Sequence, residues 1–272
     1  MAEELLSVTN LSVSFRMYQG ALTHTLVAGM HDVNLHLNRG EILAVVGASG
    51  SGKSLLAHAV LGILPYNAVT SGEMRYRGEL LDAALQEQLR GRAMALIPQS
   101  VTYLDPLMRV GKEVCGLYGA PDDMAATFRR LHLEERVQRL YPFQLSGGMA
   151  RRVLFSTAVI TDAALIIADE PTPGMDARSA AEALQILREL ADTGKGVLLI
   201  THDIDLAALV ADTVAVFYEG RSVDMVPAAA FRGDGTALAH PYTRALYHAL
   251  PQNGFACYTA EEVERMTAGG GA

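Results

Sequence analysis

The chain has 272 residues, of which 50% are hydrophobic and 19% are charged, and its formal net charge is −8. A chain of this length can bury a substantial core, and the composition is typical of a folded protein rather than a disordered one. The excess of acidic residues does not favour a nucleic-acid partner, and we expect none.

Two features bear on compartment and membrane attachment. Residues 1–6 carry two glutamates and no basic residue, so we expect no secretory signal, and no apolar run is long enough to span a bilayer. The two cysteines, Cys115 and Cys257, form no metal-ligand or CxxC pattern, which favours reduced thiols in a reducing compartment. We therefore predict a soluble chain that serves a membrane only through partners.

The first part of the chain is typical of strands followed by a helix. Residues 5–15 are rich in apolar and β-branched side chains, residues 35–37 alternate, and residues 42–46 form an apolar run that ends at glycine. Residues 52–64 have the length and periodicity of a helix that ends before a proline. Residues 93–98 predict another short strand.

A stretch of helical character follows. It runs from residue 107 to about residue 145, with candidate helices at residues 124–133 and 134–140. We predict a small helical subdomain of about residues 107–160, inserted into the larger fold.

The second half of the chain alternates regularly. We predict helices at residues 147–161, 177–191 and 204–210, which alternate with strands at residues 164–168, 196–200 and 214–218. A last helix is predicted at residues 238–250. Alternation of this length indicates a mostly parallel sheet covered by helices on both faces. The predicted fold class is therefore α/β.

A glycine-rich loop is a candidate phosphate site. Residues 47–54 match the pattern GxxxxGK[ST] directly after the strand at residues 42–46 and before a helix. The glycines let backbone N–H groups turn inward around an anion, and the helix N-terminus adds its dipole. We expect Lys53 to reach the β- and γ-phosphates and the Ser54 hydroxyl to ligate Mg²⁺. The predicted nucleotide-binding residues of this loop are Gly47, Ser49, Gly50, Ser51, Gly52, Lys53 and Ser54.

Two carboxylates follow the apolar strand at residues 165–168. Asp169 at the strand end can hold Mg²⁺ through its water shell, and Glu170 can orient or deprotonate an attacking water. Two acids after a buried strand are also common as a solvated strand end or a helix cap. Together with the phosphate loop, however, they favour hydrolysis of ATP with Mg²⁺.

Further motifs, in their order along the chain, resemble those of the ABC ATPases. Residues 145–149 (LSGGM) resemble the signature sequence, and residues 171–176 resemble the D-loop. Gln99 resembles the Q-loop glutamine, and His202, within Thr-His-Asp, resembles the switch histidine. Phe15 lies where this family places an aromatic that stacks on adenine.

The resemblance covers nearly the whole chain and implies a fold. It implies a P-loop NTPase of the ABC-ATPase type, with an N-terminal antiparallel β subdomain and the inserted helical subdomain. We expect this cassette to occupy residues 1–250 and a C-terminal tail to occupy residues 251–272.

The resemblance also implies roles within the site. Gln99 would contact Mg²⁺ and sense the γ-phosphate, and His202 would contact the γ-phosphate, so that both act with the catalytic Glu170. Phe15 would stack on the adenine, although Tyr18 is a rival for this role.

The signature residues are implied to act on a second subunit. Ser146, Gly147 and Gly148 open a helix and offer a hydroxyl, backbone N–H groups and a dipole to an anion. In the family that anion is the γ-phosphate held by the other subunit, so ATP would join two cassettes.

The tail points to a branch of the family. Residues 239–246 (AHPYTRAL) closely resemble a tail motif of the oligopeptide, dipeptide and nickel importer ATPases. Residues 141–143, and Met149 where most cassettes have glutamine, look most like the nickel or metallophore branch. Peptide-importer ATPases often bind an iron–sulfur cluster beyond this motif, and Cys257 alone cannot supply the four cysteine ligands.

We therefore predict an ATPase subunit that powers an importer for nickel, a metal–metallophore complex or a related small solute. A di- or oligopeptide importer is the alternative. A soluble ABC ATPase acting on nucleic acid is less favoured.

The importer resemblance implies partners at the cytoplasmic face of the inner membrane. These are two transmembrane permease subunits, an extracytoplasmic solute-binding protein and a second homologous ATPase, and residues 101–110 resemble the stretch that lies beside the permease. Met149 lacks the amide of the usual glutamine, and importers of the resembled family commonly pair two different cassettes, so we expect a heterodimer with two inequivalent sites. The alternative is that Met149 simply packs at the start of its helix.

Overall fold

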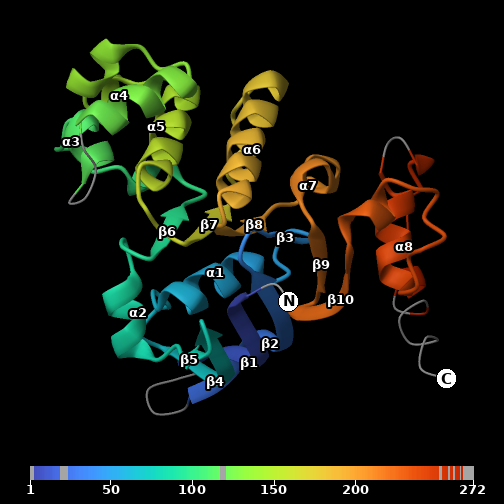
Figure 1. Ribbon diagram of the computed structural model, residues 1–272. Helices are drawn as coiled ribbons and strands as arrows, with labels where there is room; N and C mark the ends of the chain where they lie inside the picture. The colour runs from blue at the N-terminus through green and yellow to red at the C-terminus, as the bar shows by residue number, and fades with distance from the viewer. Residues whose placement is uncertain are drawn as a thin grey trace.

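The computed structural model describes residues 3–18, 24–116, 121–250, 253–256, 258–259, 261–263 and 265. Figure 1 shows these residues arranged around a central sheet, with one group of helices above it and a second sheet below. Cys257 and most of the predicted tail at residues 251–272 lie outside the described residues.

The central sheet has six strands in the order β10-β9-β3-β8-β7-β6. Its neighbouring strands pair in parallel, except that the edge strand β10 is antiparallel to β9. The strands are β3 (Ile42–Gly47), β6 (Met94–Ile97), β7 (Leu165–Asp169), β8 (Gly196–Ile200), β9 (Thr213–Tyr218) and β10 (Arg221–Pro227). The α/β prediction with a mostly parallel sheet is confirmed, whereas β10 has no counterpart in the sequence prediction.

Alternating side chains of β3 face two separate cores. Ile42, Ala44 and Val46 belong to the core under the outer helices, whereas Leu43 and Val45 belong to the core under the second sheet. A strand that is covered on both faces is apolar throughout, which is why this run was visible in the sequence.

Helices cover both faces of the central sheet. The outer layer contains α5 (Gly147–Val159), α6 (Ala177–Asp192) and α7 (Ile204–Val210), and the layer between the two sheets contains α1 (Lys53–Leu61). The predicted helix at residues 52–64 is too long at its C-terminal end. Gly62 ends α1 in a left-handed conformation with φ of 66°.

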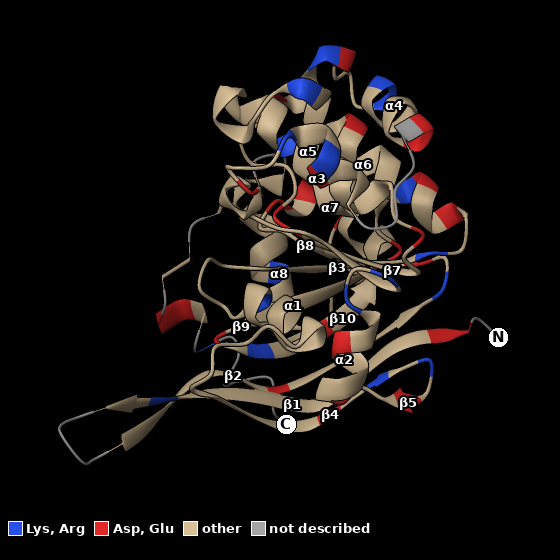
Figure 2. Cartoon of the chain, turned by 90° about the vertical axis from the view of Figure 1, so that its left-hand side faces the viewer, with Lys and Arg blue, Asp and Glu red and all other residues tan. Residues whose placement is uncertain are grey.

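The second sheet is antiparallel, with the strand order β2-β1-β4-β5. Its strands are β1 (Glu4–Tyr18), β2 (His24–Asn38), β4 (Ala68–Tyr76) and β5 (Glu79–Leu80), and α2 (Ala83–Leu89) follows them. Only the first strand was predicted near its full length. The far end of the β1–β2 hairpin projects from the body of the molecule in Figure 2, and apolar side chains such as Leu26 and Val27 are exposed there.

The region between β6 and β7 is helical, as the sequence predicts. It contains η1 (Val101–Tyr103), α3 (Val110–Cys115), α4 (Pro121–Arg130), η2 (Glu135–Arg139) and η3 (Pro142–Gln144) before α5. The candidate helix at residues 134–140 is a 3₁₀ helix, and the one at residues 124–133 begins and ends earlier. The exact domain boundaries stay a prediction.

The last elements lie beside β9 and β10. They are η4 (Ala228–Phe231) and α8 (Pro241–His248), which is shorter than the predicted helix at residues 238–250. Within the described part of the chain, no helix combines the length and the apolar character needed to cross a bilayer.

Candidate active site

The glycine-rich loop runs from the end of β3 to the start of α1. Gly47 has φ of 154°, and a Cβ there would lie 2.2 Å from the Phe217 carbonyl oxygen. Gly50 and Gly52 have φ of 80° and 91°. These values lie in the region that favours glycine, so glycines at these three positions allow the loop to turn its N–H groups inward.

Lys53 occupies the inside of this loop. Lys53 is 6% exposed, and its Nζ donates to the carbonyl oxygens of Gly47 and Ala48 at 2.8 Å each. Burial lowers the pKa of Lys53, and the nearby Glu170 and Asp169 oppose this effect. An anion in the loop would offer this ammonium group a charged partner in place of neutral carbonyls, so the residues fit a bound phosphate.

Ser54 and Asp169 are brought together from α1 and β7. The Ser54 hydroxyl donates to Asp169 Oδ1 at 3.0 Å, and Asp169 is 4% exposed. Burial raises the pKa of Asp169, and the hydrogen bond from Ser54 opposes this rise. Hydroxyl and carboxylate oxygens are ligands that Mg²⁺ accepts, so this pair fits the predicted metal site.

Glu170 is held in a restricted conformation at the end of β7. Its φ is 46°, its backbone N–H donates to the Ile200 carbonyl at 2.8 Å, and its carboxylate oxygens lie 2.8 and 2.9 Å from His202 Nδ1. The Glu170 side chain is 9% exposed, whereas that of His202 is 65% exposed. The pair therefore joins a buried carboxylate to an imidazole at the surface.

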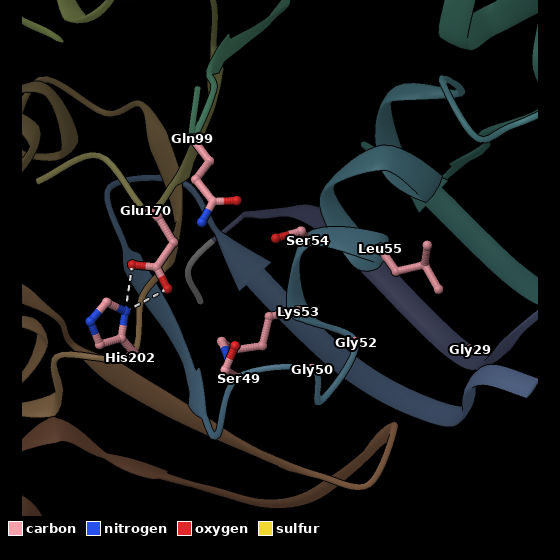
Figure 3. A pocket seen from close by; sticks show the side chains of 10 residues that line it. All are labelled: Gly29, Ser49, Gly50, Gly52, Lys53, Ser54, Leu55, Gln99, Glu170 and His202. Carbon is pink, nitrogen blue, oxygen red and sulfur yellow. Dashed lines mark hydrogen bonds and ion pairs between the residues drawn. The ribbon is translucent and has the colours of Figure 1, made fainter. Parts of the chain in front are cut away.

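Most of the predicted site residues of the phosphate loop and the strand ends line one pocket of about 630 Å³, which is drawn in Figure 3. Gly47, Ser51 and Asp169 are not among its lining residues. Its size lies in the range of small-molecule sites. In Figure 3 the Gln99 side chain extends between Glu170 and Ser54, while Lys53 and Ser49 lie on the opposite side. The predicted residues that line the pocket are Ser49, Gly50, Gly52, Lys53, Ser54, Gln99, Glu170 and His202.

Comparison with known proteins decides the family. The sequence profile of the ABC transporter family matches residues 30–173. The oligopeptide transport ATP-binding protein OppD of Lactococcus lactis subsp. cremoris (strain SK11) is 36% identical over 269 residues, which cover 92% of this chain and 77% of that protein. The chain belongs to the ABC transporter family. It is an ATPase of the ABC type.

Two further comparisons define the extent of the similarity. The uncharacterised ABC transporter ATP-binding protein YejF of Escherichia coli (strain K12) is 37% identical over 92% of this chain, and the chain spans 49% of that protein. An ATP-binding cassette solved as a dimer in a post-hydrolysis state, bound to ADP and Pi, has a TM-score of 0.72 and 23% identity. That match covers 82% of this chain and 99% of the other, and it establishes the shared ABC cassette fold.

The signature residues of this ABC cassette do not line the pocket. Ser146 is the N-cap of α5, where its hydroxyl accepts a hydrogen bond from the Met149 N–H at 3.3 Å. A Cβ on Gly147 would meet nothing within 4 Å, and one on Gly148 would lie 3.9 Å from the Gly174 carbonyl oxygen. The Met149 side chain is half-buried against the outer core, in keeping with the packing alternative.

The two candidate adenine-stacking residues lie outside the pocket lining. Phe15 is half-buried, and its ring and the Leu55 side chain both cover Gly29. Gly29 and Leu55 do line the pocket, so Phe15 lies next to its wall. Tyr18 is 71% exposed, and its ring centroid lies 4.3 Å from that of His24.

Sequence reasoning missed three residues of this region. Gly29 and Leu55 line the pocket, and Gly29 lies in the part of β2 that was not predicted. Arg151 of α5 is 8% exposed and donates to the Pro98 carbonyl at 3.2 Å and to the Gln99 carbonyl. Arg151 and Arg152 are consecutive near the start of α5, so the sequence carried no signal for which of the two is buried.

Proposed function

We propose that the chain is the ATP-hydrolysing subunit of an importer for oligopeptides or related small solutes. The supporting observation is the convergence of Lys53, Gln99 and Glu170 on one pocket. The sequence similarity to an oligopeptide transport ATP-binding protein supports the importer assignment.

The residues take distinct roles in this proposal. Lys53 and the N–H groups of the loop hold the phosphates of ATP. Ser54, Asp169 and Gln99 would hold Mg²⁺, which would neutralise charge on the phosphates. Glu170 orients or deprotonates the attacking water, and His202 contacts the γ-phosphate.

The transported solute separates two branches of the family. Residues 141–143, Met149 and the single cysteine beyond the tail motif favour a nickel or metallophore importer, but neither relative described above is named for nickel. Met149 packs against the core, which supports the alternative that it acts as a packing residue at the start of its helix. We therefore favour the peptide alternative, and the nickel branch stays a prediction.

A surface formed mainly by residues that follow Gln99 in the chain supports a membrane partner. Asp105, Leu107, Met108, Arg109, Lys112 and Tyr141 line a shallow depression of about 510 Å³. Leu107 is 87% exposed, and the nearby Tyr103 is 55% exposed. We propose that a permease subunit docks here at the cytoplasmic face of the membrane, since exposed apolar side chains of this size are typical of interaction sites.

The complete importer in this proposal contains two permeases, an extracytoplasmic solute-binding protein and a second homologous ATPase. The signature residues support the second ATPase, because Gly147 faces open space in this chain. Whether the second cassette is a different chain stays a prediction.

The test uses the assembled importer. The chain would be purified together with its permease subunits and the second ATPase and reconstituted in liposomes with the solute-binding protein. ATP hydrolysis and solute uptake would be measured with an oligopeptide mixture, with Ni²⁺ and without solute, and the Glu170→Gln importer would serve as the inactive control.

We expect the oligopeptide mixture to stimulate hydrolysis and to accumulate in the liposomes. Stimulation by Ni²⁺ alone would overturn the peptide assignment in favour of the nickel branch. ATP hydrolysis that requires nucleic acid and is indifferent to the membrane subunits would overturn the importer role.

A further inference from the structure

Arg151 is a buried cation on the helix that begins with the signature. It lies on α5, one turn after Gly147, and it is 8% exposed. A guanidinium group carries several N–H donors and stays charged, so its burial is costly unless those donors find acceptors. Burial accordingly lowers the pKa of Arg151. The place of its acceptors therefore shows what this side chain connects.

The acceptors of Arg151 are two backbone carbonyl oxygens beyond the end of β6. Nη1 donates to the Pro98 carbonyl at 3.2 Å and to the Gln99 carbonyl. β6 is an edge strand of the central sheet and its pairing with β7 ends at Ile97, so the sheet does not hold these two residues. Nε is buried and has no hydrogen-bond partner among the described residues. One nitrogen of Arg151 thus links α5 to the segment that carries Gln99.

Gln99 enters the pocket from an exposed position. The residue is exposed, and its side chain extends between Glu170 and Ser54 in Figure 3. A side chain of a site keeps its geometry only where neighbouring residues fix it, and for an exposed side chain this depends on the backbone. Ser100, the N-cap of η1, fixes the backbone on the C-terminal side of Gln99. The buried guanidinium fixes it at Gln99 itself and on the N-terminal side.

We propose that Arg151 is a positioning residue for Gln99, holding its backbone so that the amide side chain is directed toward the Mg²⁺ of bound ATP. The inference rests on the proposed function, in which Gln99 holds Mg²⁺. Arg151 itself contacts neither the nucleotide nor the metal in this account. Because α5 begins with the signature, the same hydrogen bonds tie the position of Gln99 to that of the signature helix.

The next residue of the helix provides a matched control. Arg152 is half-buried, and its donors reach the carbonyl oxygens of Gly148 at 3.3 Å and of His132 at 3.4 Å. It therefore stabilises α5 and its contact with the helical region without contacting Gln99. Replacing Arg152 removes a side chain of the same kind from the same helix.

The variant Arg151→Met tests the role on the purified chain. Methionine is unbranched and adaptable, so it fills buried space while removing every donor to the two carbonyls. Mn²⁺ takes the same oxygen ligands as Mg²⁺, and its affinity for the ATP-bound chain would be measured by electron paramagnetic resonance. We expect that affinity to fall about fivefold, which is the usual effect of one hydrogen bond. ATP binding in EDTA should be unchanged, because Lys53 is untouched.

A double-mutant cycle shows whether the effect passes through Gln99. Gln99→Ala should weaken Mn²⁺ binding at least as much as Arg151→Met does. Adding Arg151→Met to Gln99→Ala should weaken it no further, because no amide is left to position. Arg152→Met should change neither Mn²⁺ affinity nor ATP binding in EDTA.

Arg151→Lys keeps the buried charge and its N–H donors but lacks the planar fork of the guanidinium. We expect an affinity for Mn²⁺ between those of the wild type and Arg151→Met. This variant provides the same comparison if Arg151→Met fails to fold.

Three results would overturn the positioning role. The first is a folded Arg151→Met chain, or in its place Arg151→Lys, that binds Mn²⁺ as tightly as the wild type. The second is an equal loss in Arg152→Met, which would reveal only a general weakening of α5. The third is a further loss when Arg151→Met is added to Gln99→Ala. A Gln99→Ala chain with wild-type Mn²⁺ affinity would instead overturn the proposed role of Gln99, so the two failures are distinguishable.

Discussion

The phosphate loop and the signature segment differ in the contacts that this chain itself provides to each of them. Lys53 and Asp169 are 6% and 4% exposed and have hydrogen-bond partners within the chain. Ser146 and Gly147 are exposed, and a Cβ on Gly147 would meet nothing within 4 Å. The first region is built by the chain's own sheet and helices. The second presents a helix start outward, so its contribution to a nucleotide site requires another surface.

The largest expected effect comes from replacing Glu170, which separates ATP turnover from ATP binding at the phosphate loop. Glu170→Gln should lower ATP turnover of the assembled importer by at least about hundredfold, since it removes the proposed general base. The affinity of the purified chain for Mg-ATP should be retained, because Lys53 and Ser54 are untouched. Steady-state hydrolysis and equilibrium binding measure the two quantities.

Glu87→Gln is the matched control for this substitution, because Glu87 is exposed on α2. It should change neither quantity. Wild-type turnover by the Glu170→Gln importer would remove Glu170 from the role of base, unless the second ATPase carries the turnover. To exclude turnover by the second ATPase, the measurement is repeated with the equivalent glutamate of that subunit also replaced.

The next largest effect comes from replacing Lys53 in the phosphate loop. Lys53→Ala should weaken Mg-ATP binding by the purified chain by about tenfold or more, because hydrogen bonds to charged groups contribute more than neutral ones. Isothermal titration would measure it. The exposed Lys112 of α3 provides the control Lys112→Ala, which should bind normally. Equal binding by all three proteins would contradict the assignment of the loop.

The parallel core of the fold could be predicted from the sequence because its strands are apolar along their whole length. β8 and α7 were predicted with the bounds that the structure shows. β4 and β10 were missed, because most of their residues are exposed or only half-buried. Their strand character depends on pairing with β1 and β9, and local pattern carries little of that information.

The same contrast applies to the site. Lys53, Glu170 and His202 belong to local motifs that mark their positions, and the structure gathers them at one pocket. Gly29 reaches that pocket only through the pairing of β2 with β1, so no local signal marked it. Tyr242 was visible as part of a tail motif, but its packing against Tyr218 depends on the placement of α8.

A smaller effect concerns Phe15, next to the wall of the pocket, which we expect to stack on adenine. Phe15→Leu should weaken Mg-ATP binding by about fivefold, since base–aromatic stacking contributes at least this much. Binding of inorganic tripolyphosphate should be unchanged, because it has no base. Tyr18→Leu should leave both affinities unchanged. The opposite pattern, with loss in Tyr18→Leu alone, would transfer the stacking role to Tyr18.

The central claim is that the signature of this chain acts on the nucleotide of another cassette, and Gly147→Asp tests it. An aspartate at the start of α5 favours the helix dipole, so the fold should keep its Tm, but it would repel an approaching γ-phosphate. Gly233→Asp is the control, because a Cβ there also meets nothing within 4 Å.

The most direct measurement is the molar mass, by sedimentation, of the Glu170→Gln chain with Mg-ATP and the second ATPase. We predict an ATP-dependent one-to-one complex that persists with Gly233→Asp and is lost with Gly147→Asp, although the Gly147→Asp chain alone still binds Mg-ATP normally. A homodimer of this chain that forms with Mg-ATP and supports transport would contradict the heterodimer. A complex that survives Gly147→Asp, or a Gly147→Asp chain that loses its own affinity for Mg-ATP, would contradict the division of the site between two cassettes.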